Sequence, residues 1–267
     1  MDKNIINSAA YEDISDHVIL AISDLQQYMS NFQLYKKDSI IYCKTDFTKL
    51  LFEHLRFSKR KYILITHHSD YLIDGNWFNL KPKNIIKWFA INAIYKHPNL
   101  IPIPMGIWTS EGRAYYQSHH KIKWFIENIN RFQNKTKTTD LVYCNWGDTN
   151  IKRKKIIEKI SKNVKYKWTS GLEFKEYCEE MSSYKFIIAP PGNGDCDTHR
   201  AYESLYMGCF PIVIKAPFNN TFKGLPIIQV NDYSEVTNEL LEESLNKTYN
   251  LEKIYIEYWH KKIMKIL

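Results

Sequence analysis

The sequence lacks any apolar run long enough to cross a membrane. No window of the 267 residues holds eighteen consecutive apolar residues, and the opening stretch MDKNIINSAAYEDISDHV is too polar for a signal peptide. We therefore expect a soluble, cytoplasmic protein without a membrane segment of its own. The sequons at Asn134, Asn219 and Asn246 then carry no information, because an unsecreted chain is not glycosylated at them.

Cysteine patterns that would hold a disulfide framework or a metal are also missing. The cysteines are odd in number and include no C-x-x-C pair, which is typical of reduced thiols in a cytosol-like compartment. They are Cys43, Cys144, Cys178, Cys196 and Cys209. We find no zinc-finger spacing and no aromatic motif of the kind that binds RNA.

Acidic residues are outnumbered, 29 against 37 Lys and Arg, which leaves a net charge of +8. This balance favours acidic partners such as nucleotide phosphates, nucleic acid or anionic surfaces. The lysines are scattered, and richness in Lys, Asn, Ile and Tyr also fits a biased genome, which we prefer to a nucleic-acid footprint. A hydrophobic content of 44% with many aromatic residues excludes a disordered chain.

The most informative stretch is residues 185–214, KFIIAPPGNGDCDTHRAYESLYMGCFPIVI. Its pattern predicts a strand over 186–189, a loop, a helix over 198–207 and a second strand over 210–214. Gly192 and Gly194 are free to take positive φ and to bring backbone N–H groups close to a ligand. A loop that opens onto a helix N-terminus after a parallel strand is where α/β proteins bind anions.

Two side chains on this helix are candidates for ligand binding. Arg200 and Glu203 lie three residues apart, so both project from one side of the helix. A guanidinium suits a diphosphate, and a carboxylate suits the paired hydroxyls of a ribose. The alternative is that the two side chains simply pair on a solvated helix face, and their spacing does not decide between these interpretations.

The stretch carries a resemblance to known enzymes. The residues concerned are Pro191-Gly192, Asp195, Arg200, Glu203, Gly208 and Pro211-Ile212-Val213. In this order they resemble the donor-binding segment of exostosin-like glycosyltransferases and, more loosely, that of alpha-1,3-fucosyltransferases. The resemblance implies a GT-B plan, with two Rossmann-like α/β domains facing across a cleft, and a nucleotide-sugar donor. Many eukaryotic members of these families are anchored in the Golgi, so the missing anchor points to a bacterial or viral setting.

The resemblance also implies which residues hold the donor. The N–H groups of Gly192, Asn193 and Gly194 would bind the diphosphate with Arg200, and Glu203 would bind the ribose. A strand over 141–144 is followed by the loop NWGDTN and the basic stretch KRKK. In a GT-B donor domain this loop faces the cleft, so the further donor-binding candidates are Asn145, Gly147, Thr149 and Arg153. Residues 152–155 otherwise predict a solvated helix face.

Polar residues that follow an earlier strand are the catalytic candidates. The apolar run 62–66 predicts a buried strand, and it ends in HHSDYLID. Side chains at the end of a parallel strand lie on the functional edge of an open sheet. The candidates are His67, His68, Asp70 and Asp74. For the base that deprotonates an acceptor hydroxyl we choose Asp70 ahead of His67 and His68.

The remaining segments set the expected domain organisation. The first element is predicted as a helix over 14–25, the pattern of 84–92 fits a helix or a strand, and a loop over 108–120 precedes a helix over 121–132. That loop either lines an acceptor groove or is an exposed connection. The polar stretch 133–140 predicts a linker. We expect an acceptor-side domain over 1–135, a nucleotide-sugar-binding domain over 136–250, and a final helix within 251–267 that packs back on the first domain.

The sequence thus predicts a glycosyltransferase that moves a sugar from a nucleotide sugar to a hydroxyl of a glycan or glycoconjugate, inverting and metal-independent, with no cofactor. Asp195-Cys196-Asp197 has the spacing of metal-dependent transferases, but it directly precedes a helix start and is interpreted as a capping segment. The alternatives are a non-catalytic nucleotide- or sugar-binding module, a nucleic-acid-binding protein and an epimerase on the same fold. The donor sugar, the acceptor and the stereochemical outcome depend on pocket shape.

Overall fold

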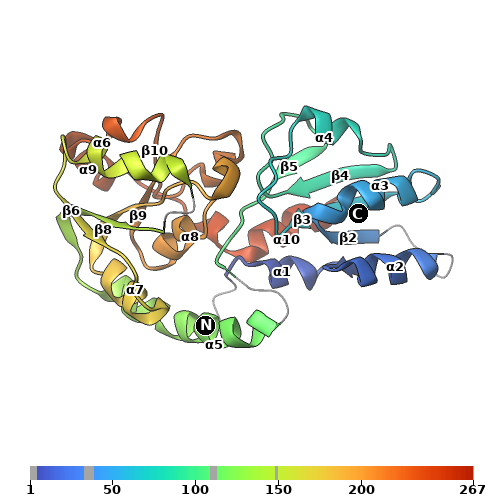
Figure 1. The fold of residues 1–267 in the computed structure, drawn as a ribbon, viewed down its shortest axis with the longest axis horizontal. Helices are drawn as coiled ribbons and strands as arrows, with labels where there is room; N and C mark the ends of the chain where they lie inside the picture. Colours follow the sequence, from blue (N-terminus) through green and yellow to red (C-terminus); the bar gives the residue numbers. More distant parts are fainter. Residues whose placement is uncertain (1–4, 33–38, 109–112, 148–149, 267) are drawn as a thin grey trace. The chain divides into compact units, whose positions relative to one another are not determined.

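The computed structural model describes residues 5–32, 39–108, 113–147 and 150–266 (Figure 1). The chain divides into two compact units. The first unit is built from Ile6–Met105, with Ala216–Thr221 and the residues from Glu257 onward. The second unit is built from Gly106–Lys215 and Phe222–Ile256, together with Ile5. Each is described here by itself.

The first unit contains a five-stranded parallel sheet in the order β1-β2-β3-β4-β5. Its strands are β1 (His17–Ile19), β2 (Ser39–Lys44), β3 (Tyr62–His67), β4 (Ile85–Ala90) and β5 (Leu100–Pro102). Its helices are α1 (Ser8–Glu12), α2 (Ile22–Ser30), α3 (Thr48–Leu55), α4 (Gly75–Asn79) and α10 (Ile256–Met264), with a short 3-10 turn at Thr45–Phe47. Every residue of β3 is buried, as the apolar run predicts for a central parallel strand.

The second unit contains another five-stranded parallel sheet, in the order β10-β9-β8-β6-β7. Its strands are β6 (Thr138–Asn145), β7 (Tyr166–Thr169), β8 (Tyr184–Ile188), β9 (Phe210–Ile214) and β10 (Ile228–Val230). Its α-helices are α5 (Arg113–Asn134), α6 (Ile156–Ile160), α7 (Phe174–Met181), α8 (His199–Tyr206) and α9 (Asn238–Leu245). The 3-10 turns that position the site are η3 (Ile151–Lys155) and η4 (Asn193–Asp195).

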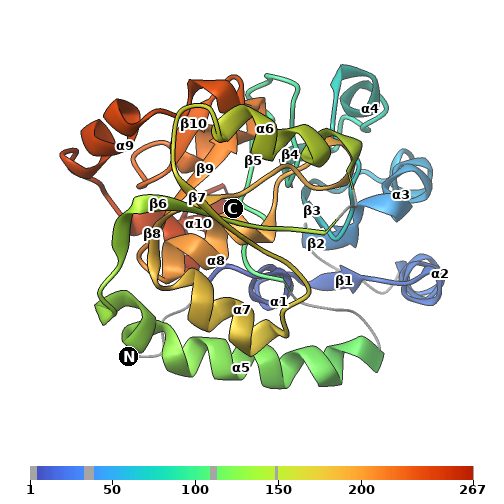
Figure 2. The same cartoon turned by 60° about the vertical axis from the view of Figure 1, so that its left-hand side comes forward.

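The two faces of the second sheet are covered by different helices. Figure 2 shows α6 and α9 on one side and α5, α7 and α8 on the other. Val142 and Cys144 of β6 join the core under α6, whereas Tyr143 between them faces the opposite side and stacks on Tyr184. This alternation is the two-residue period of a strand. The prediction of an α/β protein with two parallel sheets is therefore confirmed.

Two predicted elements are wrong in type or extent. The predicted helix over 14–25 is instead a short strand, β1, followed by α2, because residues 17–19 pair in register with Ile41–Cys43 of β2. The predicted loop over 108–120 is in part helical, since α5 begins at Arg113. Residues 84–92, which fitted either type, contain β4. Sheet pairing with distant strands overrides the local periodicity at these places.

The division into units differs from the predicted domain boundary at residue 135. The units divide between Met105 and Gly106, so α5 belongs to the second unit. It lies beside α7 (Figures 1 and 2), where Arg131 pairs with Glu179. Within the first unit, Nε2 of His260 on α10 contacts the carbonyl oxygen of Ala10 at 2.7 Å. None of the helices in the described ranges is both long and apolar enough to span a membrane.

Candidate ligand-binding site of the second unit

The loop between β8 and α8 is closed by its own backbone. The Gly192 N–H donates to the Cys196 carbonyl at 3.0 Å, and the Cys196 N–H donates to the Asn193 carbonyl at 3.2 Å. A Cβ on Gly192 would lie 2.9 Å from the Asp197 carbonyl oxygen, so only glycine fits there without a shift. Gly194 has φ of 62°, the left-handed conformation that glycine adopts most readily. The Gly192 N–H, which was predicted to bind a ligand, is thus bonded within the loop in this structure.

The two aspartates of this loop hold protein groups. Thr198 is the N-cap residue of α8, so neither Asp195 nor Asp197 occupies the cap itself. Asp197 accepts from the Thr198 N–H at 2.8 Å and from the Tyr202 hydroxyl one turn along the helix. Asp195 forms an ion pair with Lys152. Asp197 therefore stabilises the start of α8, while Asp195 joins the loop to η3.

Arg153 connects the loop after β6 with the loop after β8. Its guanidinium is buried, donates to the Pro191 carbonyl from Nη2 at 2.8 Å and from Nε at 3.1 Å, and donates to the Gly147 carbonyl from Nη1 at 3.1 Å. Asn150 adds a bond from Nδ2 to the Gly192 carbonyl at 2.9 Å. In this structure Arg153 thus positions both loops through backbone carbonyls. The neighbouring Lys152, Lys154 and Lys155 are exposed, as expected for a solvated face.

Arg200 and Glu203 do not lie on a solvated helix face. Glu203 is only 9% exposed, and Arg200 is partly buried. The Tyr177 hydroxyl, which comes from α7, donates to Glu203 Oε2 at 2.9 Å and accepts from Arg200 Nε at 3.2 Å. The guanidinium carbon also lies 5.6 Å from the centre of the Tyr177 ring. Tyr177 therefore joins the two predicted ligand-binding side chains into one cluster.

Within the described part of the chain, Arg200 and Glu203 make no direct ion pair and keep unused hydrogen-bonding groups. Arg200 donates only from Nε, so no protein acceptor contacts Nη1 or Nη2. Glu203 accepts only at Oε2, which leaves Oε1 without a donor. These N–H groups and this oxygen are therefore available to hydrogen-bond a ligand.

A second polar network lies at the ends of β6 and β7. The Tyr143 hydroxyl is 2.7 Å from the Thr169 hydroxyl and donates to Glu180 Oε2 at 3.4 Å. Asn145, which is 9% exposed, donates from Nδ2 to the Tyr143 and Thr169 hydroxyls at 3.2 and 3.1 Å. No described residue donates to its Oδ1. Asn145 therefore stands as predicted at a strand end, whereas the partners that fix its orientation were not found from the sequence.

The other candidates in this unit are less informative. Gly147 is exposed with open space where a Cβ would stand, and Thr149 lies outside the described residues. Asn193 and Gly194 are exposed at the tip of the closed loop. Among the described residues, no group of three His, Cys, Asp or Glu side chains is placed to hold a metal ion.

Burial sets the acid–base properties of the cluster. It raises the pKa of Glu203 above the ordinary 4.5, although Arg200 and the Tyr177 hydroxyl act in the opposite direction. It raises the pKa of the Tyr177 hydroxyl well above 10.0, so that this hydroxyl remains a donor at neutral pH. For Arg200, burial lowers the pKa, but Tyr177 and Glu203 outweigh it and the net shift is upward.

The raised pKa of Glu203 predicts a specific pH dependence of stability. The folded state holds the Glu203 proton more tightly than the unfolded chain does. The protonated carboxyl therefore contributes fully to the free energy of unfolding below about pH 4.5, and this contribution is lost as the pH rises through the folded-state pKa. In Glu203→Gln, which does not titrate, this loss is absent. The free energy of unfolding of the variant, measured by urea denaturation, should therefore rise relative to that of the wild type as the pH is increased from about 4 to 7.

The exposed carboxylate Glu243 supplies the control for that experiment. Glu243→Gln removes the same negative charge from the surface and corrects for the change in net charge. If the wild type instead became more stable relative to Glu203→Gln as the pH rises, the pKa of Glu203 in the folded state would lie below its value in the unfolded chain. The assigned effect of burial would then be wrong.

The predicted catalytic residues of the first unit differ in their availability. His67 is 3% exposed; its Nε2 is 3.0 Å from the Met105 carbonyl, and its Nδ1 accepts the His68 N–H at 2.9 Å. Both ring nitrogens are thus used within the fold, which argues against His67 as a base. Asp70 is exposed. Asp74 caps α4 by accepting the Trp77 N–H at 2.8 Å, which gives it a structural role.

His68 occupies an unusual backbone position directly after β3. Its φ of 56° is left-handed, which costs a residue with a side chain on the order of 1–2 kcal/mol. Its Nε2 lies 3.6 Å from a carboxylate oxygen of Glu12, and its ring centre lies 5.1 Å from that of His67. Glu12 carried no signal in the sequence, because it comes from α1 and reaches His68 only in the folded unit.

Comparison with known proteins assigns the chain to no family and gives it no function. No family model matches the chain, and no curated protein matches it either. The case for a function therefore depends on the geometry of the cluster around Arg200 and Glu203.

Proposed function

We propose that the second unit binds a nucleotide sugar and that the chain is a glycosyltransferase of the GT-B type. The observation that carries the proposal is the cluster that Arg200 and Glu203 of α8 form with Tyr177 of α7, with N–H groups of the cation and one oxygen of the carboxylate left without a protein partner among the described residues. The carboxyl edge of a parallel sheet is where such folds take their ligands.

The chemistry of the open groups defines the class of ligand. Nη1 and Nη2 of Arg200 require acceptors, and a diphosphate offers several charged ones in a geometry that suits the planar guanidinium. Oε1 of Glu203 requires a donor, and the hydroxyls of a ribose are donors. A nucleoside diphosphate carries both kinds of group on one molecule. Burial strengthens both contacts, because the local dielectric constant is lower than in water.

The proposed reaction needs few protein groups. The acceptor hydroxyl oxygen forms a bond to the anomeric carbon of the donor sugar, and the bond from that carbon to the diphosphate oxygen breaks. The hydroxyl proton passes to a base, for which Asp70 is our first choice and His68 the second. The leaving diphosphate takes the electron pair, and Arg200 stabilises the charge that develops on it. Inversion at the anomeric carbon and independence of a metal are parts of the same proposal.

A panel of nucleotide sugars tests the binding step. Thermal unfolding and calorimetry with UDP-, GDP-, TDP- and CMP-sugars should identify one nucleotide that raises the melting temperature, because a ligand at 100 times its Kd stabilises the folded state by about 2.7 kcal/mol. The same sugar should be released or transferred on incubation with a glycan acceptor. If no nucleotide at millimolar concentration stabilises the protein, the proposal fails.

A further inference from the structure

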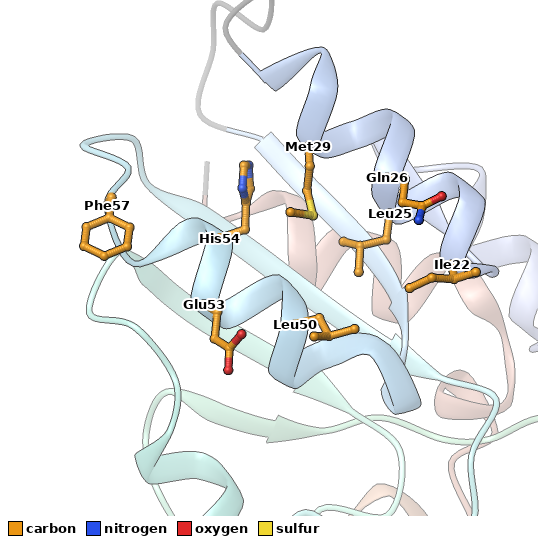
Figure 3. A pocket seen from close by; sticks show the side chains of 8 residues that line it. All are labelled: Ile22, Leu25, Gln26, Met29, Leu50, Glu53, His54 and Phe57. Carbon is orange, nitrogen blue, oxygen red and sulfur yellow. The ribbon is translucent and has the colours of Figure 1, made fainter.

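The first unit carries an apolar groove between α2 and α3. The groove has a volume of about 500 Å³ and is lined by Ile22, Leu25, Gln26 and Met29 from α2, by Leu50, Glu53 and His54 from α3, and by Phe57 (Figure 3). Ile22, Met29 and Leu50 remain 47%, 40% and 46% exposed. Grouped exposed apolar side chains of this kind mark a surface that is covered by something else. Neither unit needs this face for the proposed nucleotide-sugar site, which lies in the second unit.

Phe57 is the most exposed of the side chains that line the groove. It follows α3, is 87% exposed, and lies past His54 at one end of the groove in Figure 3. An apolar surface seated on the groove would cover Phe57 together with the side chains of α2 and α3.

The charges around Phe57 are almost all positive. The segment from residue 49 to residue 61 contains five basic residues, Lys49, Arg56, Lys59, Arg60 and Lys61, and one acidic residue, Glu53. Arg56 and Lys59, on either side of Phe57, are both exposed. A second copy of the chain would bring the same positive charges together, which disfavours self-association through this face.

We propose that the α2–α3 face docks on an anionic membrane surface. Phe57 and the apolar side chains of the groove would enter the boundary between headgroups and acyl chains, as aromatic and aliphatic anchors of surface-bound proteins do. Arg56 and Lys59 would contact the anionic headgroups, and each basic residue near such a surface strengthens binding roughly fivefold. The docking is separate from the proposed transferase activity and does not depend on it.

Vesicle flotation with the full chain tests this proposal. The protein should bind vesicles of phosphatidylcholine mixed with phosphatidylglycerol and not vesicles of phosphatidylcholine alone, and binding should weaken as salt is raised. Phe57→Ser should reduce the partition coefficient by about tenfold, since the largest exposed anchor is removed. Leu80→Ser is the matched control, because Leu80 is 48% exposed on the same unit, and its effect should be less than twofold.

The charge contribution has its own matched pair of variants. Arg56→Gln with Lys59→Gln should lower the partition coefficient by about twentyfold, as expected for two basic contacts. Lys154→Gln with Lys155→Gln removes the same charge from an exposed stretch of the second unit and should change binding by less than twofold. An equal loss in both pairs would mean that only total charge matters, which would overturn the assigned face.

Insertion of the segment around Phe57, directly after α3, is measured separately with Phe57→Trp. Emission of this variant should be quenched by brominated phospholipid beyond the quenching of the seven native tryptophans in the wild type. Absence of extra quenching, or absence of binding to anionic vesicles, would overturn the proposal. So would a dimer in size-exclusion light scattering that Leu50→Asp dissociates, because a second copy would then cover the face.

Discussion

Arg200→Ala is expected to weaken binding of the nucleotide sugar by roughly 10- to 100-fold, because a charge-assisted hydrogen bond to an anion contributes about 1.5–3 kcal/mol. Arg200 is the partly buried cation beside Glu203, and its Nη1 and Nη2 atoms have no acceptor among the described residues. A diphosphate would supply those acceptors. Calorimetry with the nucleotide sugar found in the panel measures the loss of affinity directly.

Two further variants separate the role of Arg200 from a general effect of charge. Arg200→Lys keeps the positive charge but loses the planar fork, so its affinity should fall between those of the wild type and of Arg200→Ala. Arg131→Ala removes an exposed guanidinium that pairs with Glu179 on α7, and it should leave ligand affinity unchanged. If Arg200→Ala bound the nucleotide sugar as tightly as the wild type, the proposed diphosphate contact would be wrong.

The unliganded stability of Arg200→Ala must be measured alongside its affinity. Removal of the guanidinium leaves the buried Glu203 carboxylate with the Tyr177 hydroxyl as its hydrogen-bonding partner in the cluster, and loss of the nearby positive charge should lower the stability of the folded state. The lower pH range, where Glu203 is protonated more readily in the folded state, should reduce this cost. Binding is therefore compared at a temperature where circular dichroism shows both proteins folded.

Asp70→Asn is expected to lower the rate of sugar transfer by about 10²- to 10⁴-fold, the range that a general base contributes. Asparagine keeps the shape of the side chain but cannot take the proton from the acceptor hydroxyl. The proposed donor contacts are made by Arg200 and Glu203, so donor affinity should stay unchanged in this variant. The measurement is a turnover assay with the identified donor, together with calorimetry on the same variant.

His68→Asn is the companion variant for that assay. His68 lies in a strained conformation beside Glu12, and it is the other candidate base. A large loss of turnover in His68→Asn with full activity in Asp70→Asn would transfer the role of base to His68. Donor binding without any turnover in the wild type would instead favour a non-catalytic binding module.

Local sequence patterns predicted the parts of the site that depend on near neighbours. The apolar runs predicted several of the strands, while their division into two parallel sheets was implied by the family resemblance. The glycines predicted a loop after β8, where Gly194 has the expected positive φ, whereas Gly192 has φ of −68° and is required instead by its close approach to the Asp197 carbonyl. The three-residue spacing placed Arg200 and Glu203 on one side of α8, where both reach the Tyr177 hydroxyl.

Contacts between distant segments were not predictable in this way. Tyr177 lies 23 residues before Arg200 along the chain, and its hydroxyl reaches the cluster only because α7 and α8 pack on the same face of the sheet. Arg153 was assigned to a ligand but is bonded to the carbonyls of two loops. His67 was predicted as a candidate base, but its two ring nitrogens are hydrogen-bonded to the Met105 carbonyl and to the His68 N–H.

The physical reason for this division is the range of the interactions involved. Strand and helix periodicity, glycine turns and same-face spacing arise from backbone geometry over a few residues, so the amino-acid order is enough to infer them. Burial of Glu203, the hydroxyl that bridges it to Arg200, and the pairing of residues 17–19 as a strand depend on which surfaces meet when the chain folds. These contacts between distant segments, and the hydrogen-bonding groups of the proposed binding site that they leave without a protein partner, are seen only in the three-dimensional structure.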